Sequence, residues 1–271
     1  MVAFPDYFPT RRTHMELNLK GRTALITGGS RGIGFGVAEL LAAEGCNLHL
    51  ASRSQESLDA ARKSLAGKHG VKVTVHALDL STQDNVLKLA TACGPVDILI
   101  NNAGAIPQGT ITGLDDKTWR TAWDLKVFGF INLTREIYRE MCAMKRGVIV
   151  NVVGTAGERP TANYIAGSMG NASLMALTRA LGGESPQYGV RVVAVNPGGT
   201  ETDRQVVRWK ARAAKELGDE KRWRDLTTGF PFGRLGTVDE VAAMIVFLCS
   251  ARSGYTTGTV ITVDGGASAQ K

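Results

Sequence analysis

The sequence predicts an α/β fold, a doubly wound parallel sheet with helices on both faces. Short apolar runs rich in β-branched residues alternate along the chain with longer segments of helical periodicity or length. Runs such as Asp97 to Ile100 and Gly147 to Val150 are continuously apolar, as strands buried on both faces require. The expected strands occupy residues 23–27, 48–51, 71–77, 96–100, 147–153, 190–195 and 259–263.

Length and composition predict a single domain. The chain has 271 residues, of which 44% are hydrophobic, enough for one large core near the upper size of one domain. Residues 1–20 carry aromatic residues, prolines and two adjacent arginines without periodicity, and we expect them to form a poorly ordered arm. Residues 21–271 are expected to form the domain itself.

Composition also excludes several functions. No apolar stretch approaches the roughly 20 residues that span a bilayer, and the N-terminus lacks an apolar signal-peptide core, so a soluble, cytoplasmic protein is expected. The net charge is +7, but the basic residues are dispersed and no nucleic-acid-binding motif appears. The cysteines and histidines lack the close sequence pairing of a zinc site or a redox pair, so no metal is expected. They are Cys46, Cys93, Cys142, Cys249, His14, His49, His69 and His76.

A glycine loop between the first strand and the following helix fits a nucleotide pyrophosphate. It reads Thr27-Gly28-Gly29-Ser30-Arg31-Gly32-Ile33-Gly34. Gly28 permits a sharp turn with positive φ, Gly32 permits close approach of backbone to phosphate, and Gly34 permits close packing of helix on strand. The helix then directs its N-terminal amides at the anion. Turns and helix caps use the same residues, but the position between strand and helix favours a Rossmann-type dinucleotide site.

The end of the second strand favours NADP(H) over NAD(H). A carboxylate at this position would accept hydrogen bonds from the adenosine 2′-hydroxyl, whereas a 2′-phosphate requires a cation. The strand ends in Ser52-Arg53 with no acid. Arg53 can form two hydrogen bonds to the phosphate, Ser52 can donate another, and Arg31 supplies a second charge. The alternative is that Arg53 is an ordinary solvated loop residue.

Together with further motifs, this loop resembles the short-chain dehydrogenase/reductase family. The resemblance extends from about Lys20 to Ala267. It rests on Thr27 to Gly34, the Asn-Asn-Ala-Gly motif at Asn101 to Gly104, the Asn-Pro-Gly motif at Asn196 to Gly198, and the end of the chain from Gly233 through Val263-Asp264-Gly265-Gly266.

The resemblance implies a set of cofactor-binding residues. It places Asp79 at the adenine amino group, residues 102–104 at the ribose, and residues 197–202 at the nicotinamide carboxamide, although Asn102 can also act only as a turn former. The complete expected set is Gly28, Ser30, Arg31, Gly32, Ile33, Gly34, Ser52, Arg53, Asp79, Leu80, Asn102, Ala103, Gly104, Pro197, Gly198, Thr200 and Thr202.

The reaction site departs from the family pattern. Family members use a tyrosine as acid or base, a lysine four residues later, a serine in the preceding strand-end loop and an asparagine on the neighbouring helix. Tyr164 is present, but the lysine position holds Ser168 and the asparagine position holds Lys126. The serine position is Gly154, with Thr155 beside it. Thr155 can supply the missing hydroxyl, and Ser168 is a weaker candidate.

Tyr164 requires a cation near it, because a free tyrosine has a pKa near 10 and is a poor base at neutral pH. Lys126 lies on an otherwise apolar helix face, and we hypothesise that it replaces the missing lysine. The alternative is that Lys126 extends to the surface or pairs with Asp124 or Asp115.

These features predict an NADP(H)-dependent oxidoreductase that interconverts a ketone and a secondary alcohol. The alternative is a non-catalytic nicotinamide-nucleotide-binding protein, a sensor or assembly subunit. By resemblance, residues 200–230 correspond to the substrate lid, and basic residues such as Arg204 and Arg208 favour an acidic substrate unless they form a solvated face. By resemblance, helices near 121–144 and 164–182 form subunit contacts, and we expect a homotetramer, then a dimer. No nucleic-acid or membrane partner is expected.

Overall fold

The computed structural model describes residues 15–270. Most of the expected N-terminal arm therefore lies outside the described residues. Within the part that is described, Leu19 is buried against the core, and its carbonyl accepts hydrogen bonds from the Arg22 amide and the Cys46 thiol.

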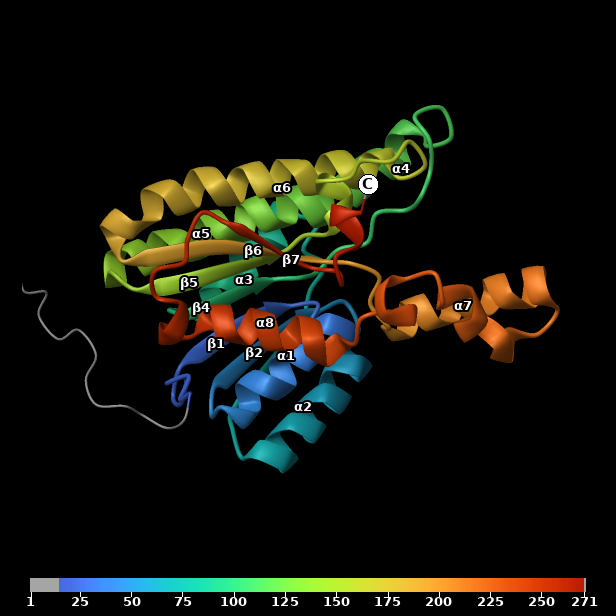
Figure 1. Ribbon diagram of the computed structural model, residues 1–271. Helices are drawn as coiled ribbons and strands as arrows, with labels where there is room; N and C mark the ends of the chain where they lie inside the picture. The colour runs from blue at the N-terminus through green and yellow to red at the C-terminus, as the bar shows by residue number, and fades with distance from the viewer. Residues whose placement is uncertain (1–14, 271) are drawn as a thin grey trace, which may run out of the picture.

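A seven-stranded, entirely parallel sheet organises the molecule (Figure 1). The strand order is β3-β2-β1-β4-β5-β6-β7, so β1 and β4 are neighbours at the point where the winding direction reverses. This confirms the predicted doubly wound sheet. The strands are β1 (Thr23–Thr27), β2 (Asn47–Ser52), β3 (Val73–Ala77), β4 (Ile98–Asn101), β5 (Gly147–Val152), β6 (Val190–Pro197) and β7 (Val260–Val263).

Helices cover both faces of the sheet (Figure 1). One face is covered by α1 (Gly32–Ala43), α2 (Gln55–His69) and α8 (Val238–Cys249). The other is covered by α3 (Gln83–Cys93), α5 (Gly129–Met144) and α6 (Ile165–Glu184). Two buried clusters of aliphatic side chains fill the layers between helices and sheet, which explains why the central strands are apolar at successive positions.

The helix expected over 121–144 is divided. α4 (Asp116–Trp123) continues into a π-helical turn, Asp124–Phe128, before α5 begins. A π-turn adds one residue per turn, and its formation depends on packing that sequence periodicity does not report. The helix expected to begin near Phe35 begins at Gly32.

The lid segment forms α7 (Asp203–Leu217) and a 3₁₀ segment, Glu220–Thr227. The two pack against each other through Ala213 and Trp223, and α7 extends away from the sheet (Figure 1). Within residues 15–270, no helix is both long and apolar enough to cross a membrane.

The histidines and cysteines that lie far apart in the sequence do not all lie apart in space. His49 on β2, His76 on β3 and Cys93 at the end of α3 direct their ligand atoms to one point. Strand pairing and helix packing, which sequence spacing does not report, bring these side chains together.

Two adjacent glycines of α6 give a matched test of how closely this helix packs against the sheet. A Cβ on Gly182 would overlap the backbone of Gly258 and the Val192 carbonyl oxygen, whereas a Cβ on Gly183 would meet nothing within 4 Å. We expect Gly182→Ala to lower the free energy of unfolding by about 1–3 kcal/mol through overpacking. Gly183→Ala should raise it by about 0.5–1 kcal/mol, because alanine loses less backbone entropy in a helix. Denaturant unfolding at equal protein concentration measures both, and equal effects at the two positions would contradict this packing.

Candidate active site

The carboxyl ends of the parallel strands bring the predicted loops to one edge of the sheet. The first of these loops follows β1. Gly28 and Gly32 have φ of 66° and 55°, and a Cβ on Gly34 would overlap the Gly28 carbonyl oxygen. The positive φ of Gly28 and the tight contact at Gly34 agree with the backbone reasons given for these two glycines, and the positive φ of Gly32 is a further reason for glycine at that position.

The N-terminus of α1 has no side-chain cap. Arg31 occupies the N-cap position without capping the helix, whereas Ser54, Thr202 and Thr237 cap α2, α7 and α8. The nearest atoms to a Cβ on Gly32 would be Thr202 carbons, at 3.4 and 3.6 Å. Uncapped amides beside bare glycine backbone form a cradle that fits a pyrophosphate.

The loops after β1 and β2 bring hydroxyl groups and two guanidinium groups together. The Ser30 hydroxyl donates to the Ser52 hydroxyl (3.2 Å), and the Arg31 guanidinium donates to the Ser57 hydroxyl (2.6 Å). Arg53 is exposed. Within residues 15–270, neither arginine forms an ion pair with a carboxylate. Two guanidinium groups without a carboxylate partner fit a 2′-phosphate, which supplies the opposite charge.

The loop after β4 is bonded to the loop after β1. The Thr27 hydroxyl accepts from the amides of Asn102 (2.9 Å) and Ala103 (3.0 Å), and the Asn102 side-chain amide donates to the Thr27 carbonyl (3.1 Å). Asn102 therefore holds the glycine loop in place, and this role is separate from its expected contact with the ribose. After β3, the Asp79 carboxylate accepts from the Ser81 amide (3.1 Å), and Leu80 is buried.

The loop after β6 is stabilised by its own polar groups. The Gly198 amide donates to the Val263 carbonyl (3.0 Å), and the Thr200 hydroxyl donates to the Gly198 carbonyl (3.1 Å). Thr202 caps α7 by accepting from the Gln205 amide (3.4 Å), so this loop connects the cofactor edge directly to the lid. Pro197 ends β6 at the same edge.

Tyr164 lies immediately before α6, as the N-cap residue. Its ring covers Gly167, where a Cβ would overlap it, and it packs against the small apolar cluster of Ile106, Ala122 and Ala166. Burial raises the pKa of the Tyr164 phenol, and the positive charges of Arg208 and Arg204 on α7 oppose that rise. The phenol therefore retains its proton at neutral pH, as a proton donor must.

Lys126 is buried in the π-helical turn, with 8% of its surface exposed. Its ammonium donates to the carbonyl oxygens of Val152 (2.7 Å) and Val153 (3.4 Å) at the end of β5, and it lies 4.6 Å from the centre of the Phe130 ring. Burial, with a smaller contribution from Arg204, lowers the pKa of Lys126 to about 7.

The position of Lys126 bears on whether it replaces the missing lysine or extends to the surface or to a carboxylate. It does not reach the surface, and it forms no ion pair within residues 15–270; Asp115 instead caps α4. Its side chain passes over Gly104, where a Cβ would overlap Lys126 Cδ, so it borders the expected ribose loop. No hydrogen bond joins Lys126 to Tyr164 in the described part of the chain.

The two candidate hydroxyl groups differ in their hydrogen bonding. The buried Ser168 hydroxyl accepts from the Thr161 amide (3.2 Å) and so holds the loop before Tyr164. Thr155 begins the 3₁₀ turn after β5 and is half-buried, and its hydroxyl has no hydrogen-bond partner within residues 15–270. Thr155 is therefore the hydroxyl that remains available to a substrate.

Beneath the site lies a buried polar chain that sequence reasoning did not find. The Asn101 side-chain amide donates to Asn151 Oδ1 (2.9 Å), the Asn151 amide donates to the Thr178 hydroxyl (3.0 Å), and Thr178 donates to the Leu174 carbonyl (2.8 Å). It links β4 and β5 to α6, and so fixes the helix that carries Tyr164. The available signal was a polar residue, Asn151, within an otherwise apolar strand.

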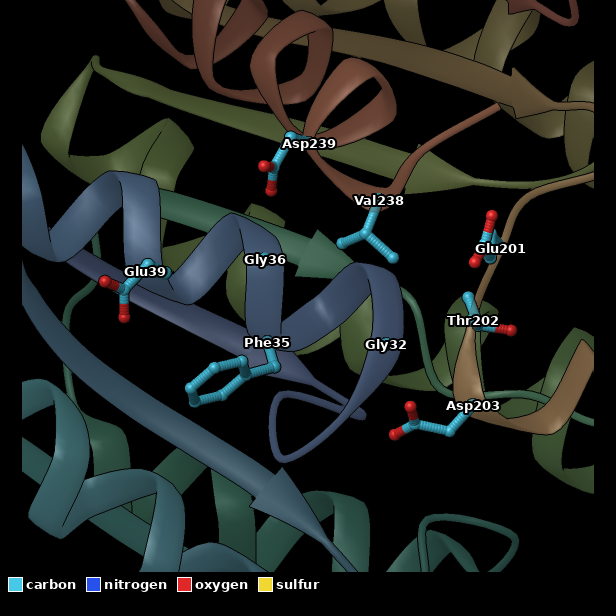
Figure 2. A pocket seen from close by; sticks show the side chains of 9 residues that line it. All are labelled: Gly32, Phe35, Gly36, Glu39, Glu201, Thr202, Asp203, Val238 and Asp239. Atoms are coloured by element: carbon cyan, nitrogen blue, oxygen red, sulfur yellow. The ribbon is translucent and has the colours of Figure 1, made fainter. Parts of the chain in front are cut away.

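A hollow of about 260 Å³ lies beside the first turn of α1 (Figure 2). Gly32 and Thr202 line it, but so do four carboxylates, which repel a phosphate. The hollow therefore flanks the expected pyrophosphate cradle and is not part of it. The carboxylates are those of Glu39, Glu201, Asp203 and Asp239.

Comparisons with known proteins identify the family of this chain. A family model described as enoyl-(acyl carrier protein) reductase matches residues 28–268. The 3-oxoacyl-acyl-carrier-protein reductase of Chlamydia muridarum is 32% identical, with 93% of this chain and 99% of that protein covered. The 2,3-dihydro-2,3-dihydroxybenzoate dehydrogenase of Bacillus subtilis is 31% identical, with 92% and 97% covered.

Solved structures show the same relationship. L-sorbose reductase from Gluconobacter frateurii, in complex with NADPH and L-sorbose, has a TM-score of 0.90 and 31% identity over 95% of this chain and all of that one. A protein described as belonging to the short-chain dehydrogenase/reductase family has a TM-score of 0.81 and 33% identity, with 94% and 100% covered. The chain therefore belongs to the short-chain dehydrogenase/reductase family of oxidoreductases.

Proposed function

We propose that this oxidoreductase uses NADPH to reduce the carbonyl group of a small acidic substrate, with Tyr164 as proton donor and Lys126 as the cation of the site. The observation that carries this proposal is the burial of the Lys126 ammonium at the end of β5, beside Gly104, without a carboxylate partner in the described chain. A buried, unpaired charge is costly, and such groups concentrate at functional sites.

The cofactor is held by the residues expected from the sequence. The uncapped start of α1 receives the pyrophosphate, Ser52, Arg53 and Arg31 receive the 2′-phosphate, and the remaining members of the set contact adenine, ribose and nicotinamide. When bound, NADPH supplies the hydride that the carbonyl carbon accepts. Its role in relatives, including the NADPH complex of L-sorbose reductase, supports this assignment.

Tyr164 and Thr155 act on the carbonyl oxygen. Thr155, whose hydroxyl has no partner among the described residues, donates a hydrogen bond that polarises the carbonyl. Tyr164, whose pKa is raised by burial, donates the proton that the oxygen acquires as the alcohol forms. In the oxidation of an alcohol the same groups act in reverse. This chemistry and the family relationship disfavour a non-catalytic sensor.

Lys126 restores the proton of Tyr164. Because its pKa is about 7, Lys126 gains and loses protons at neutral pH, as an ordinary surface lysine does not. This role belongs to the lysine that the family places four residues after the tyrosine, where this chain has Ser168.

The unpaired positive charges of the expected lid segment favour an acidic substrate. Three arginines of the segment 203–227 are paired with carboxylates: Arg212 with Glu216, Arg222 with Asp225, and Arg224 with Glu201. Arg204 and Arg208, in the first two turns of α7, have no such partner in the described chain, and their charges act on Tyr164. Two unpaired guanidinium groups near the proton donor fit a substrate carboxylate or phosphate.

We also propose a cytoplasmic homotetramer, with a dimer as the second choice. Phe128 and Met169, on the two helical segments expected at subunit contacts, are 48% and 49% exposed. Large apolar side chains exposed on one face favour association.

The four cysteines are free, which fits a reducing compartment.

Removing the Arg53 side chain tests the cofactor assignment. We expect Arg53→Ala to weaken NADPH binding by about 10- to 100-fold, because a charge-assisted hydrogen bond contributes about 1.5–3 kcal/mol. NADH binding should change by less than about twofold, since it has no 2′-phosphate. Fluorescence titration measures both. Arg62→Ala on α2, where Arg62 pairs with Asp59, is the matched control. An equal loss for both cofactors would contradict the assignment.

Replacing Lys126 tests the catalytic cation. We expect Lys126→Met to lower kcat by about 100-fold or more, close to the loss in Tyr164→Phe, while the Kd for NADPH changes by less than about threefold. Lys117→Met, at an exposed position on α4, is the control. Retention of full activity by Lys126→Met would refute the replacement.

A second measurement on Lys126→Met separates function from structure. The unfolded lysine, with a pKa of 10.5, binds more protons between pH 7 and 10 than the folded lysine with a pKa of about 7. Stability from this group therefore rises with pH across that window. The stability of Lys126→Met relative to wild type should fall by at least about 1 kcal/mol between pH 7 and 9.

Removing Arg208 tests the acidic substrate. The wild-type enzyme should have a higher kcat/KM for a small β-keto acid than for its ethyl ester. We expect Arg208→Ala to lower the acid-to-ester ratio by about tenfold or more, because one charge-assisted contact is lost. Arg212→Ala should leave the ratio unchanged, since Arg212 is already paired. An unchanged ratio in Arg208→Ala would exclude this contact.

A further inference from the structure

Three potential metal ligands converge on the sheet face beneath α3. His49 Nδ1 lies 2.9 Å from His76 Nε2, and Cys93 Sγ lies 3.7 Å from the same His76 nitrogen. All three ligand atoms lie within 4.8 Å of one another. The register of β2 and β3 pairs His49 with Thr74 and Ala51 with His76, so the two imidazoles are diagonal neighbours on one face of the sheet.

The distances fit a tetrahedral centre. Nitrogen and sulfur ligands bind zinc at about 2.1 and 2.3 Å, so two nitrogens lie about 3.4 Å apart and a nitrogen and a sulfur about 3.6 Å apart. The observed 2.9 and 3.7 Å differ from these values by half an ångström or less. The two rings are stacked nearly parallel, at 10°, with their centroids 5.2 Å apart.

A hydrogen bond between the histidines explains only part of this arrangement. His76 Nε2 is a single donor or acceptor, yet both His49 and Cys93 approach it. None of the three side chains is fully buried, so an ion has access from solvent.

We propose that His49 Nδ1, His76 Nε2 and Cys93 Sγ bind one divalent transition-metal ion of the zinc class, with water as the fourth ligand. Two nitrogens and one sulfur favour zinc over magnesium or calcium, which prefer oxygen. On binding, the Cys93 thiol releases its proton to solvent. The imidazole that donates the hydrogen bond moves its proton to its other ring nitrogen, so both ligand nitrogens present a lone pair.

The site goes beyond the proposed reaction. β3 is the edge strand, and β5 and α6, which position Lys126 and Tyr164, lie three strands beyond β2 in the sheet order. The ion would join β2 and β3 to the end of α3, which stabilises the part of the fold that holds the adenosine end of the cofactor. Activity and metal binding are therefore separable.

Cobalt provides a spectroscopic probe of the ligands. The purified full-length protein, treated with chelator and then titrated with Co²⁺, should bind one equivalent and show visible d–d bands with a near-ultraviolet sulfur-to-cobalt band. We expect Cys93→Ser to lose the sulfur band and to weaken Co²⁺ binding by at least about tenfold. Cys142→Ser, which changes another partly buried thiol on α5, should retain both. A sulfur band that survives in Cys93→Ser would overturn the proposal.

A measurement on the wild-type protein does not depend on the folding of variants. Alkylation of Cys93, followed by mass spectrometry, should slow by at least about tenfold when one equivalent of Zn²⁺ is present, because a metal-bound thiolate is a poorer nucleophile. Alkylation of Cys142 should not change and serves as the internal control. Equal rates for Cys93 with and without Zn²⁺ would overturn the proposal, whatever the result with NADPH.

Discussion

The site depends on the hydrogen bonds between Thr27 and the Asn102-Ala103 backbone, because they join the loop after β1 to the loop after β4. β1 lies between β2 and β4, so the chain leaves β1 and β4 in opposite directions and a crevice opens at their carboxyl ends. Four hydrogen bonds join the two loops across this crevice, the fourth from the Asn102 side-chain amide to the Gly28 carbonyl. Gly28 and Gly34 must lack side chains because the loops approach so closely. A shift of either loop would displace the phosphate cradle and the edge that Lys126 borders.

The burial of Lys126 imposes a cost that the surrounding structure reduces. The ammonium has two carbonyl oxygens and the face of Phe130, but no described carboxylate, and its pKa falls accordingly. The π-helical turn that carries it is an uncommon backbone form, and such turns occur frequently at functional sites. In the proposed function the cation lies on this helix, and Ser168, at the position of the family's lysine, holds the loop before Tyr164 instead.

The sequence predicted the sheet because its central strands are buried on both faces and are apolar at successive positions. It predicted that Lys126 lies on an apolar face, but not that its partners are the carbonyls of Val152 and Val153, since backbone groups have no sequence signature. The π-turn was missed because it depends on packing between layers. His49, His76 and Cys93 were judged too scattered, at separations of 27 and 17 positions, and only the register of β2 with β3 brings them together.

Arg204 connects the lid to the proton-transfer groups, since its charge lowers the pKa of both Lys126 and Tyr164. An anionic group bound by Arg204 and Arg208 would neutralise that charge. The pKa of Lys126 and the pKa of Tyr164 would then both rise, so each group would hold its proton more firmly. Burial already keeps the Tyr164 phenol protonated at neutral pH, so Lys126, with a pKa of about 7, is the group whose charge would change. If the proposed acidic substrate binds these arginines, Lys126 would become more fully protonated while the substrate is present, and departure of the product would let it exchange its proton near pH 7 again.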